Sequence, residues 1–169
     1  MAKNKVADGH APHPLPKPKR NGCFACGNDN PEGMRLRFYF DETARETVCR
    51  FKLQRRYQGP PGHAHGGIIA TILDEAMGKV NKLRNVIALT RSMNVEYLKP
   101  VPLGELLTVT GREQSVHGRE HINVAEITAE SGEVLARSTG KFIAVDPARM
   151  FAKVAKFVPP EPRQSPESP

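Results

Sequence analysis

The stretch from His65 to Gly78 is the feature that most constrains what this chain of 169 residues can fold into. Apolar residues recur there at the three-to-four-residue spacing of a helix that is buried on one side. The pattern predicts one helix from about Gly66 to Lys82. Segments with β-type patterns precede and follow it, and turns rich in Gly and Pro separate them. One long helix followed by a meander of strands is an α+β pattern, in which an antiparallel β-sheet wraps around the central helix.

The predicted strands share an alternating or continuous apolar pattern that is bounded by turn residues. They cover residues 36–40, 47–53, 86–89, 93–97, 106–115, 122–129 and 134–145.

The length of the chain fits one compact domain with a tail at each end. Residues 1–20 are basic and rich in Pro, and we expect them to be disordered. The folded domain is expected to cover residues 21–147, and residues 148–169 to form a C-terminal extension with a disordered, Pro-rich end. No apolar run approaches the roughly 18 residues that a transmembrane helix needs. The N-terminal segment also lacks the apolar core of a secretory signal, so we expect a cytoplasmic protein without a membrane span.

The net charge of +7 does not indicate a nucleic-acid-binding surface, because much of it lies in the two tails. Residues 1–20 hold five basic side chains against one acidic one, and residues 148–169 hold four against two. Aromatic side chains are not interleaved with these charges, as a base-stacking surface requires. The pattern is typical of solvated tails, and we expect no nucleic-acid partner.

Cys23 and Cys26 have the spacing of a metal-ligand pair, but a structural zinc site needs four ligands. No second Cys-x-x-Cys pair in the sequence completes such a site. A redox pair of the thioredoxin type would begin a helix, whereas residues 27–31 (GNDNP) are typical of a turn. We therefore expect the two cysteines to be small residues of a folded loop, and we expect no metal site.

The start of the predicted helix and a carboxylate two turns later point to acyl-transfer chemistry. The amides that follow His65, at Gly66 and Gly67, lie at a helix N-terminus and favour a polarised carbonyl oxygen or a developing oxyanion. A carboxylate on the same helix can act as a nucleophile or activate a water. The simplest reaction that uses both groups is hydrolysis.

Two adjacent acids follow on this helix, and their angular positions differ. Glu75 is placed to pair with Lys79 at i,i+4 on a solvated face. Asp74 lies on a strip of small residues, with Ala70 and Gly78 one turn away on either side. A ligand or a second chain can approach such a strip closely, and the angle alone does not choose between them. Asp74 is therefore the better catalytic candidate.

Four motifs make the chain resemble the hotdog-fold acyl-CoA thioesterases, in particular their phenylacetate-pathway and THEM-type branch. They lie at residues 21–27, 30–34, 65–74 and 93–100. The combination is specific, because a His-Gly-Gly start is followed at the family's spacing by a helical Asp and then by the expected strand. The resemblance covers residues 21–147 and implies a sheet that wraps around the central helix.

This resemblance also implies an active site at the interface of two subunits. The amide of Gly66 polarises the thioester carbonyl, and Asp74 from the other subunit acts as general base or nucleophile. Thr90 is either the hydroxyl residue that positions the water or a plain strand residue. His65 is expected to brace the loop that precedes the helix by hydrogen bonding rather than to abstract a proton, and His65 and Gly67 are expected to contribute to substrate binding. The expected assembly is a homodimer at minimum, with a dimer of dimers as the larger form.

One position departs from the family pattern. THEM-type members place an Asn six residues before the histidine, where this chain has Gly59, and the adjacent Gln58 is the substitute amide donor. Four basic side chains are candidates for contacting the phosphates of coenzyme A, or else are solvated surface charges. They are Arg91, Arg55, Arg56 and Lys99.

The sequence therefore predicts hydrolysis of an acyl-CoA thioester to a free carboxylic acid and coenzyme A, with no cofactor besides the coenzyme A of the substrate. The alternative is a non-catalytic protein that binds acyl-CoA in the same pocket, because fold and site pattern persist when chemistry is lost. The identity of the acyl chain does not follow from the sequence.

Overall fold

The computed structural model describes residues 13–15 and 21–151, which form an antiparallel sheet packed on one long helix. The strands follow the order β1-β2-β3-β5-β6-β7-β4 across the sheet. None of the described helices is long and apolar enough to cross a membrane. The elements along the chain are β1 (His13–Pro14), β2 (Tyr39–Asp41), β3 (Glu46–Phe51), η1 (Arg55–Tyr57), α1 (Gly66–Asn81), η2 (Lys82–Arg84), β4 (Ala88–Tyr97), β5 (Leu107–His117), β6 (Glu120–Ala129), β7 (Val134–Ala144) and α2 (Pro147–Phe151).

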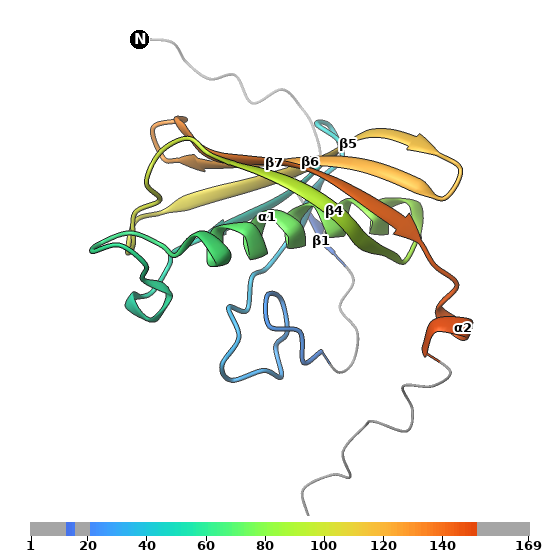
Figure 1. Ribbon diagram of the computed structural model, residues 1–169, viewed down its shortest axis with the longest axis horizontal. Helices are drawn as coiled ribbons and strands as arrows, with labels where there is room; N and C mark the ends of the chain where they lie inside the picture. The colour runs from blue at the N-terminus through green and yellow to red at the C-terminus, as the bar shows by residue number, and fades with distance from the viewer. Residues whose placement is uncertain (1–12, 16–20, 152–169) are drawn as a thin grey trace, which may run out of the picture.

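Helix α1 lies along one face of the curved sheet, and the sheet bends around it (Figure 1). It contacts strands β3, β4, β5, β6 and β7, so most of the sheet covers its apolar arc. The observed helix, Gly66–Asn81, confirms the predicted one to within a residue at its end. The sheet thus wraps around the central helix, as the α+β pattern predicted and as the resemblance to the hotdog-fold family implied.

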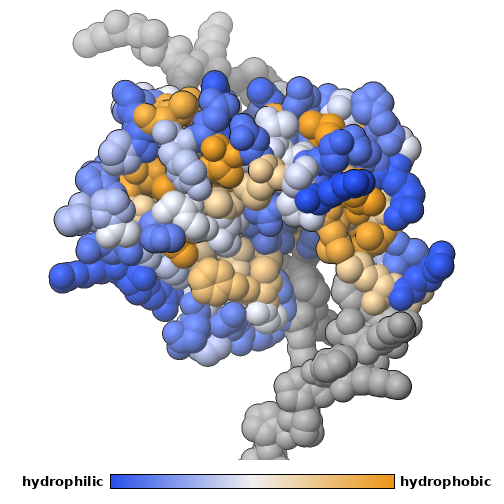
Figure 2. Space-filling view, in the orientation of Figure 1, coloured by the Kyte–Doolittle hydropathy of each residue, from blue (hydrophilic) through white to orange (hydrophobic). Residues whose placement is uncertain are grey.

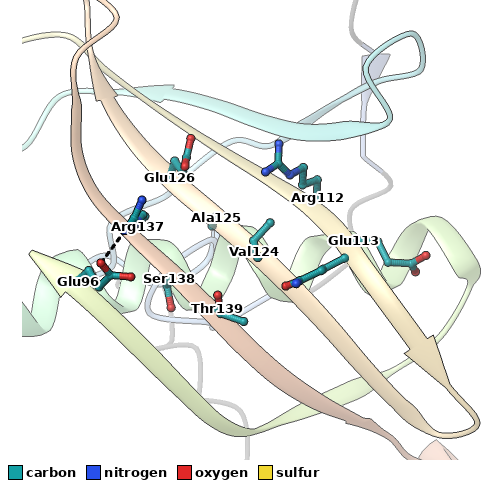
Figure 3. Close-up of a pocket in the computed structure, with 10 residues that line it drawn as sticks. Glu96, Arg112, Glu113, Val124, Ala125, Glu126, Arg137, Ser138 and Thr139 are labelled. Atoms are coloured by element: carbon teal, nitrogen blue, oxygen red, sulfur yellow. Dashed lines mark hydrogen bonds and ion pairs between the residues drawn. The ribbon is translucent and has the colours of Figure 1, made fainter. Parts of the chain in front are cut away.

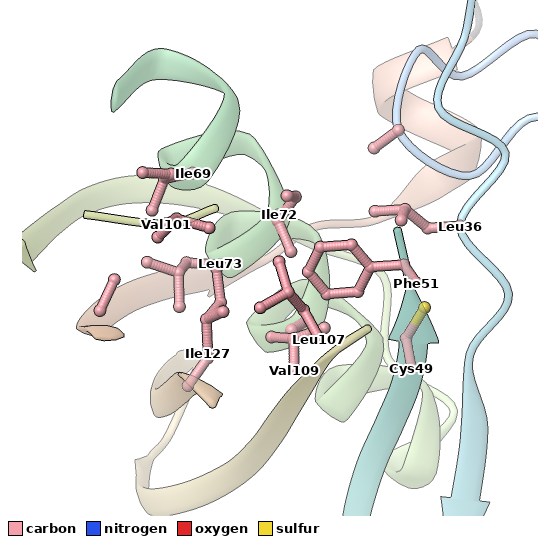
Figure 4. Packing of buried hydrophobic residues seen from close by; sticks show 14 of the residues in the cluster. Leu36, Cys49, Phe51, Ile69, Ile72, Leu73, Val101, Leu107, Val109 and Ile127 are labelled. Atoms are coloured by element: carbon pink, nitrogen blue, oxygen red, sulfur yellow. The ribbon is translucent and has the colours of Figure 1, made fainter. Parts of the chain in front are cut away.

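The hydrophobic core lies between α1 and the sheet (Figure 4). Ile72, Leu73 and Met77 of the helix are fully buried, and Val109 and Ile127 of the sheet are fully buried with them. Burying one such side chain contributes about 2 kcal/mol to folding. The free energy of this contact fixes which side of α1 faces the sheet and therefore which side remains open.

Polar bonds and one close backbone approach also hold the second half of α1 to the sheet. The Thr47 hydroxyl lies 3.1 Å from the Ala76 carbonyl oxygen, and the Asn123 amide donates to the Met77 carbonyl at 2.9 Å. Gly111 of β5 lies directly beneath the helix, because a Cβ atom added there would approach the Ala76 carbonyl oxygen to 2.7 Å. Only a glycine permits so short a distance between this helix and this strand.

Three details differ from the sequence expectations. The strand expected at residues 36–40 begins only at Tyr39, because the Met34 and Leu36 amides donate to the loop carbonyls of Phe24 and Ala25. The segments expected at 86–89 and 93–97 form the single strand β4, which runs through a bulge.

The third difference concerns residues 13–15, which we expected in a disordered tail. They pair with β2 instead, and Leu15 packs into the core. The remaining tail residues, 1–12, 16–20 and 152–169, lie outside the described residues.

The close approach at Gly111 is testable by adding one methyl group. We expect Gly111→Ala to lower the free energy of unfolding by about 1–3 kcal/mol, because the methyl group must push α1 away from β5. Gly22→Ala is the matched control, since a Cβ atom there meets nothing within 4 Å. Urea denaturation of both variants measures the difference, and an equal stability of the two would contradict this packing.

Candidate active site

His65 caps the start of α1 through its side chain. The residue is extended (φ −66°, ψ 139°), and its Nδ1 accepts a hydrogen bond from the Gly67 amide at 3.0 Å. A neutral imidazole that accepts at Nδ1 carries its proton on Nε2, so in this arrangement neither ring nitrogen is free to remove a proton. This geometry agrees with a bracing role for His65. It also means that the Gly67 amide is already hydrogen-bonded to the His65 side chain.

The amide of Gly66 differs from its neighbours in having no acceptor among the described residues. It is the first amide of α1, which has no partner inside the helix. The Tyr97 hydroxyl donates to the Gly66 carbonyl oxygen at 3.2 Å, and its ring lies 3.6 Å from where a Cβ atom of residue 66 would stand. Tyr97 thus holds the helix start against β4 while the N–H of Gly66 stays free to donate. The family resemblance had included Tyr97 only as one residue of the motif at 93–100.

Asp74 and Thr90, which the sequence singled out separately, are hydrogen-bonded to each other. The Thr90 hydroxyl of β4 donates to Oδ1 of Asp74 at 2.7 Å. This bond joins the open side of α1 to the last strand of the sheet. It leaves the second carboxylate oxygen without a bond to any described residue, so that oxygen can act on a substrate or a water.

A β-bulge sets the position of Thr90. The pairing of β4 with β7 shifts between Thr90 and Ser92, and Arg91 is the extra residue. Because side chains alternate along a strand, one extra residue changes which of them point toward the helix. Strand periodicity alone could not have separated the roles of Thr90 and Ser92.

The pKa of Asp74 is raised above its ordinary value, chiefly because the carboxylate is partly buried against α1 and β4. The Thr90 hydrogen bond favours the charged form and opposes this rise, whereas the nearby charge of Glu75 adds to it. A carboxylate with a raised pKa is a stronger base than an exposed one, which suits proton removal near neutral pH.

The small-residue strip around Asp74 is open in the single chain. A Cβ atom added at Gly78, one turn later, would find only the edge of the Phe142 ring, at 3.9 Å. No other described residue fills the space over Gly78 within 4 Å. A ligand or another chain can therefore approach this strip.

Glu75 does not lie on a solvated face as we had expected. It pairs with Lys79 at 2.6 Å, as the i,i+4 spacing predicted, but its side chain is only 18% exposed and that of Lys79 only 12%. The loop that carries Cys23 and Cys26 covers the pair, and Lys79 lies 3.0 Å from the Cys26 sulfur. The sequence could not reveal this contact, because the loop lies some fifty residues upstream of the helix.

The other predicted binding residues occupy the surface near the helix start. The Gln58 side chain forms no hydrogen bond with a described residue, and Gly59 packs beneath His65, where an added Cβ atom would lie 2.8 Å from the His65 Cα. Arg91 is exposed at the bulge. Lys99, in the loop after β4, already forms an ion pair with Glu133, in the loop before β7.

Arg56, another of the four basic candidates, is also engaged within the chain. Its guanidinium donates to the Gly33 carbonyl oxygen at 3.1 Å and lies over the ring of Tyr57. Arg55 and Arg91 are exposed and their side chains form no hydrogen bond with a described residue, and of the two Arg91 is adjacent to Thr90 in the sequence.

The separation along α1 limits what one chain can do. Eight residues separate Gly66 from Asp74, which is a rise of about 12 Å along a helix. A carbonyl under attack must lie within about 3 Å of both its oxyanion donor and its attacking group. Even with a water between the carboxylate and the carbonyl carbon, the required span is shorter than this rise, so the geometry disfavours the Gly66 amide and the Asp74 carboxylate of one chain acting on the same carbonyl.

The strand beside this site is an unpaired edge. Strand β4 ends the sheet order, so one side of its ten residues has no partner among the described strands. Several large apolar side chains at its two ends are exposed, and orange and pale patches interrupt the blue surface on the face that shows β4 and α1 (Figure 2). These side chains are Ile87, Leu89, Tyr97 and Leu98.

The opposite face of the sheet carries a hollow of about 500 Å³. It lies over β5, β6 and β7, away from α1, and charged and hydroxyl side chains line it (Figure 3). Glu96 and Arg137 form an ion pair at its margin. The Asp74 carboxylate does not border this hollow, so the candidate site is the β4 edge of α1.

The comparisons with known proteins point to one superfamily. A family model described as thioesterase superfamily matches residues 61–136. Acyl-coenzyme A thioesterase THEM4 of Rattus norvegicus is 30% identical over 116 residues, which are 68% of this chain and 50% of the rat protein. Acyl-coenzyme A thioesterase THEM5 of Homo sapiens is 26% identical over 113 residues, which are 66% of this chain and 46% of the human protein. The chain thus spans about half the length of these relatives.

A solved structure supports the same assignment. The crystal structure of a thioesterase superfamily protein superposes with a TM-score of 0.69 and 30% identity, over 73% of this chain and 60% of that one.

The electrostatics of Asp74 are open to a direct titration. We expect Thr90→Val to raise the pKa of Asp74 further, because the carboxylate loses a hydrogen bond that favours its charged form. Ser92→Ala should leave it unchanged, since the Ser92 hydroxyl does not bond Asp74. Carbon-13 NMR of the aspartate carboxyl groups across pH measures both variants. A pKa in Thr90→Val at or below that of the wild type would contradict the hydrogen bond.

Proposed function

Because the chain belongs to the thioesterase superfamily, we propose that it hydrolyses the thioester of an acyl-CoA to a carboxylic acid and free coenzyme A. The observation that carries the proposal is the Asp74 carboxylate, held by Thr90 at 2.7 Å on the open side of α1. The free Gly66 amide at the start of the same helix supports it, because acyl transfer needs both an attacking group and an oxyanion donor.

In the proposed reaction, Asp74 acts as general base. Its carboxylate takes a proton from a water, and the water oxygen forms a bond to the thioester carbonyl carbon. The carbonyl oxygen becomes negatively charged and accepts a hydrogen bond from the Gly66 N–H. The positive end of the helix dipole also stabilises this charge. Collapse of the tetrahedral species breaks the carbon–sulfur bond, and the departing coenzyme A sulfur takes up the proton from Asp74. Thr90 orients the carboxylate throughout.

We further propose that two copies of the chain build each site. The rise of about 12 Å along α1 between Gly66 and Asp74 supports this, because it disfavours one chain acting alone on one carbonyl. Antiparallel placement of two α1 helices about a two-fold axis brings Gly66 of one protomer beside Asp74 of the other and forms two equivalent sites. The unpaired edge of β4 and its exposed apolar side chains support this pairing, since such an edge tends to recruit another strand. A dimer of dimers stays a prediction of the family resemblance.

Substrate contacts follow from the same placement. Arg91, exposed beside Thr90, is positioned to meet a phosphate of coenzyme A, and Gln58 near the helix start can offer its amide to the substrate. The absence of a further cofactor and a cytoplasmic location stay predictions of the sequence.

Two substitutions at Gly66 test the oxyanion donor without removing the helix. Proline is favoured at the first position of a helix and suits an extended preceding residue such as His65, so Gly66→Pro deletes the N–H with little strain. Gly66→Ala keeps the N–H and adds a comparable Cβ atom, which would make only ordinary contact with Tyr97. We expect kcat/KM to fall on the order of a hundredfold in Gly66→Pro and far less in Gly66→Ala.

Asp74→Asn completes the test on a panel of short, medium, long and aryl acyl-CoAs. It should lose activity on the order of a hundredfold or more. Hydrolysis unchanged in Asp74→Asn, or equal losses in the two Gly66 variants, would contradict the mechanism. Tight acyl-CoA binding by the wild type without release of coenzyme A would instead establish the non-catalytic alternative.

A further inference from the structure

The side of α1 next to the Asp74 strip carries a second group of reactive side chains. Cys23, Cys26 and Glu75 place their two sulfurs and a carboxylate oxygen within 4.8 Å of one another. We call these three residues the thiol cluster. The Cys23 sulfur lies 3.8 Å from Oε2 of Glu75, and Lys79 contacts both Oε1 of Glu75 and the Cys26 sulfur. The proposed hydrolysis uses none of these groups.

The loop that presents the two thiols is tightly fixed. The Gly27 amide donates to the Cys23 carbonyl at 2.9 Å, which closes a turn over the Cys-x-x-Cys segment. Gly27 is required there, because a Cβ atom would lie 2.4 Å from the carbonyl oxygens of Asn21 and Cys23. Asn21 adds two bonds, one from its amide to the Cys26 sulfur and one that its side-chain oxygen accepts from the Cys23 amide. The turn therefore holds both sulfurs on one side, toward Glu75.

The spacing of these donor atoms suits a tetrahedral ion. Zinc binds sulfur at about 2.3 Å and carboxylate oxygen at about 2.0 Å, so neighbouring ligand atoms lie about 3.5–3.8 Å apart. The Cys23 sulfur and Glu75 oxygen have this spacing already, at 3.8 Å. The other distances between the donor atoms are at most 4.8 Å. Rotation of the exposed or half-buried side chains is enough to shorten them to the spacing that zinc requires. Two thiolates and one carboxylate favour zinc over the harder magnesium or calcium ions.

The charge of the surroundings also fits. Two thiolates, one carboxylate and a divalent ion together carry one negative charge, and the Lys79 ammonium balances it. Lys79 can keep its bond to Oε1 of Glu75 while the other oxygen binds the metal, and it can donate to a metal-bound sulfur from outside the coordination shell. The basic side chain thus supports a metal–thiolate centre in a half-buried position.

The sequence alone led us to expect no metal site, but α1 brings Glu75 to the two cysteines as a third donor. We propose that Cys23, Cys26 and Glu75 bind one Zn²⁺ ion, with a water as the fourth ligand and Lys79 as an outer donor. Binding replaces the two thiol protons, which pass to the solvent, and no oxidant or reductant is involved. The ion fastens the loop around Cys23 and Cys26 to α1.

The test uses the full-length chain, reduced and free of metal, titrated with Zn²⁺ against a chromophoric chelator. We expect one tightly bound zinc per chain. Cys26→Ser should weaken binding on the order of a hundredfold or more, and Glu75→Gln on the order of tenfold. Cys49→Ala is the matched control: Cys49 is fully buried in β3, away from the thiol cluster, and its loss should leave the affinity unchanged. Co²⁺ in place of zinc should give the near-ultraviolet thiolate absorption in the control and lose it in a Cys23→Ser/Cys26→Ser variant.

Two results would overturn the proposal. The first is a reduced wild-type chain that binds zinc no more tightly than the Cys23→Ser/Cys26→Ser variant, with both folded by circular dichroism. The second is a disulfide between Cys23 and Cys26 in the purified protein together with no zinc uptake after its reduction, which would assign the pair to redox chemistry. Both readouts are independent of thioester hydrolysis, so the outcome does not depend on the proposed function.

Discussion

The burial of one side of α1 by the sheet is the interaction on which the rest of the structure depends. Ile72, Leu73 and Met77 occupy the core, and the close approach at Gly111 fixes how the helix lies on β5. Because the helix has only one buried side, Asp74 is directed to the open side near the edge strand. The Thr90 hydroxyl of β4 then meets the carboxylate at 2.7 Å. The position of the candidate base is therefore a consequence of core packing.

The rise along the helix between Gly66 and Asp74 imposes the second constraint. An amide at the first helical residue and a carboxylate eight residues later stand about 12 Å apart, whatever the side chains between them. This separation disfavours the use of both groups by one chain. The proposed two-fold pairing would bring the donor of one chain to the base of the other. The unpaired β4 edge lies at the place where such a pairing is needed.

The sequence predicted the features that depend on local pattern. The bounds of α1 and the Glu75–Lys79 pair follow from the helical period. The choice of Asp74 over Glu75 as the base rests on the same period and stays a prediction. The contact of Thr90 with Asp74 did not follow from the strand period, because the bulge at Arg91 breaks the alternation of β4. The family resemblance indicated Thr90 only as a hydroxyl that could position the water. Long-range contacts escaped prediction altogether. The loop of Cys23 covers Glu75 from 52 residues away, which turned an expected solvated face into a half-buried cluster.

The most direct test of the two-chain site mixes two inactive variants. Gly66→Pro and Asp74→Asn chains, co-expressed with different tags, form a hybrid dimer in which one site has both the intact amide and the intact carboxylate. The other site has lost both. Random pairing of the two chains should then restore about a quarter of the wild-type kcat, and the isolated hybrid about half. Hybrid dimers as inactive as either parent would show that amide and carboxylate act within one chain, which would contradict the account.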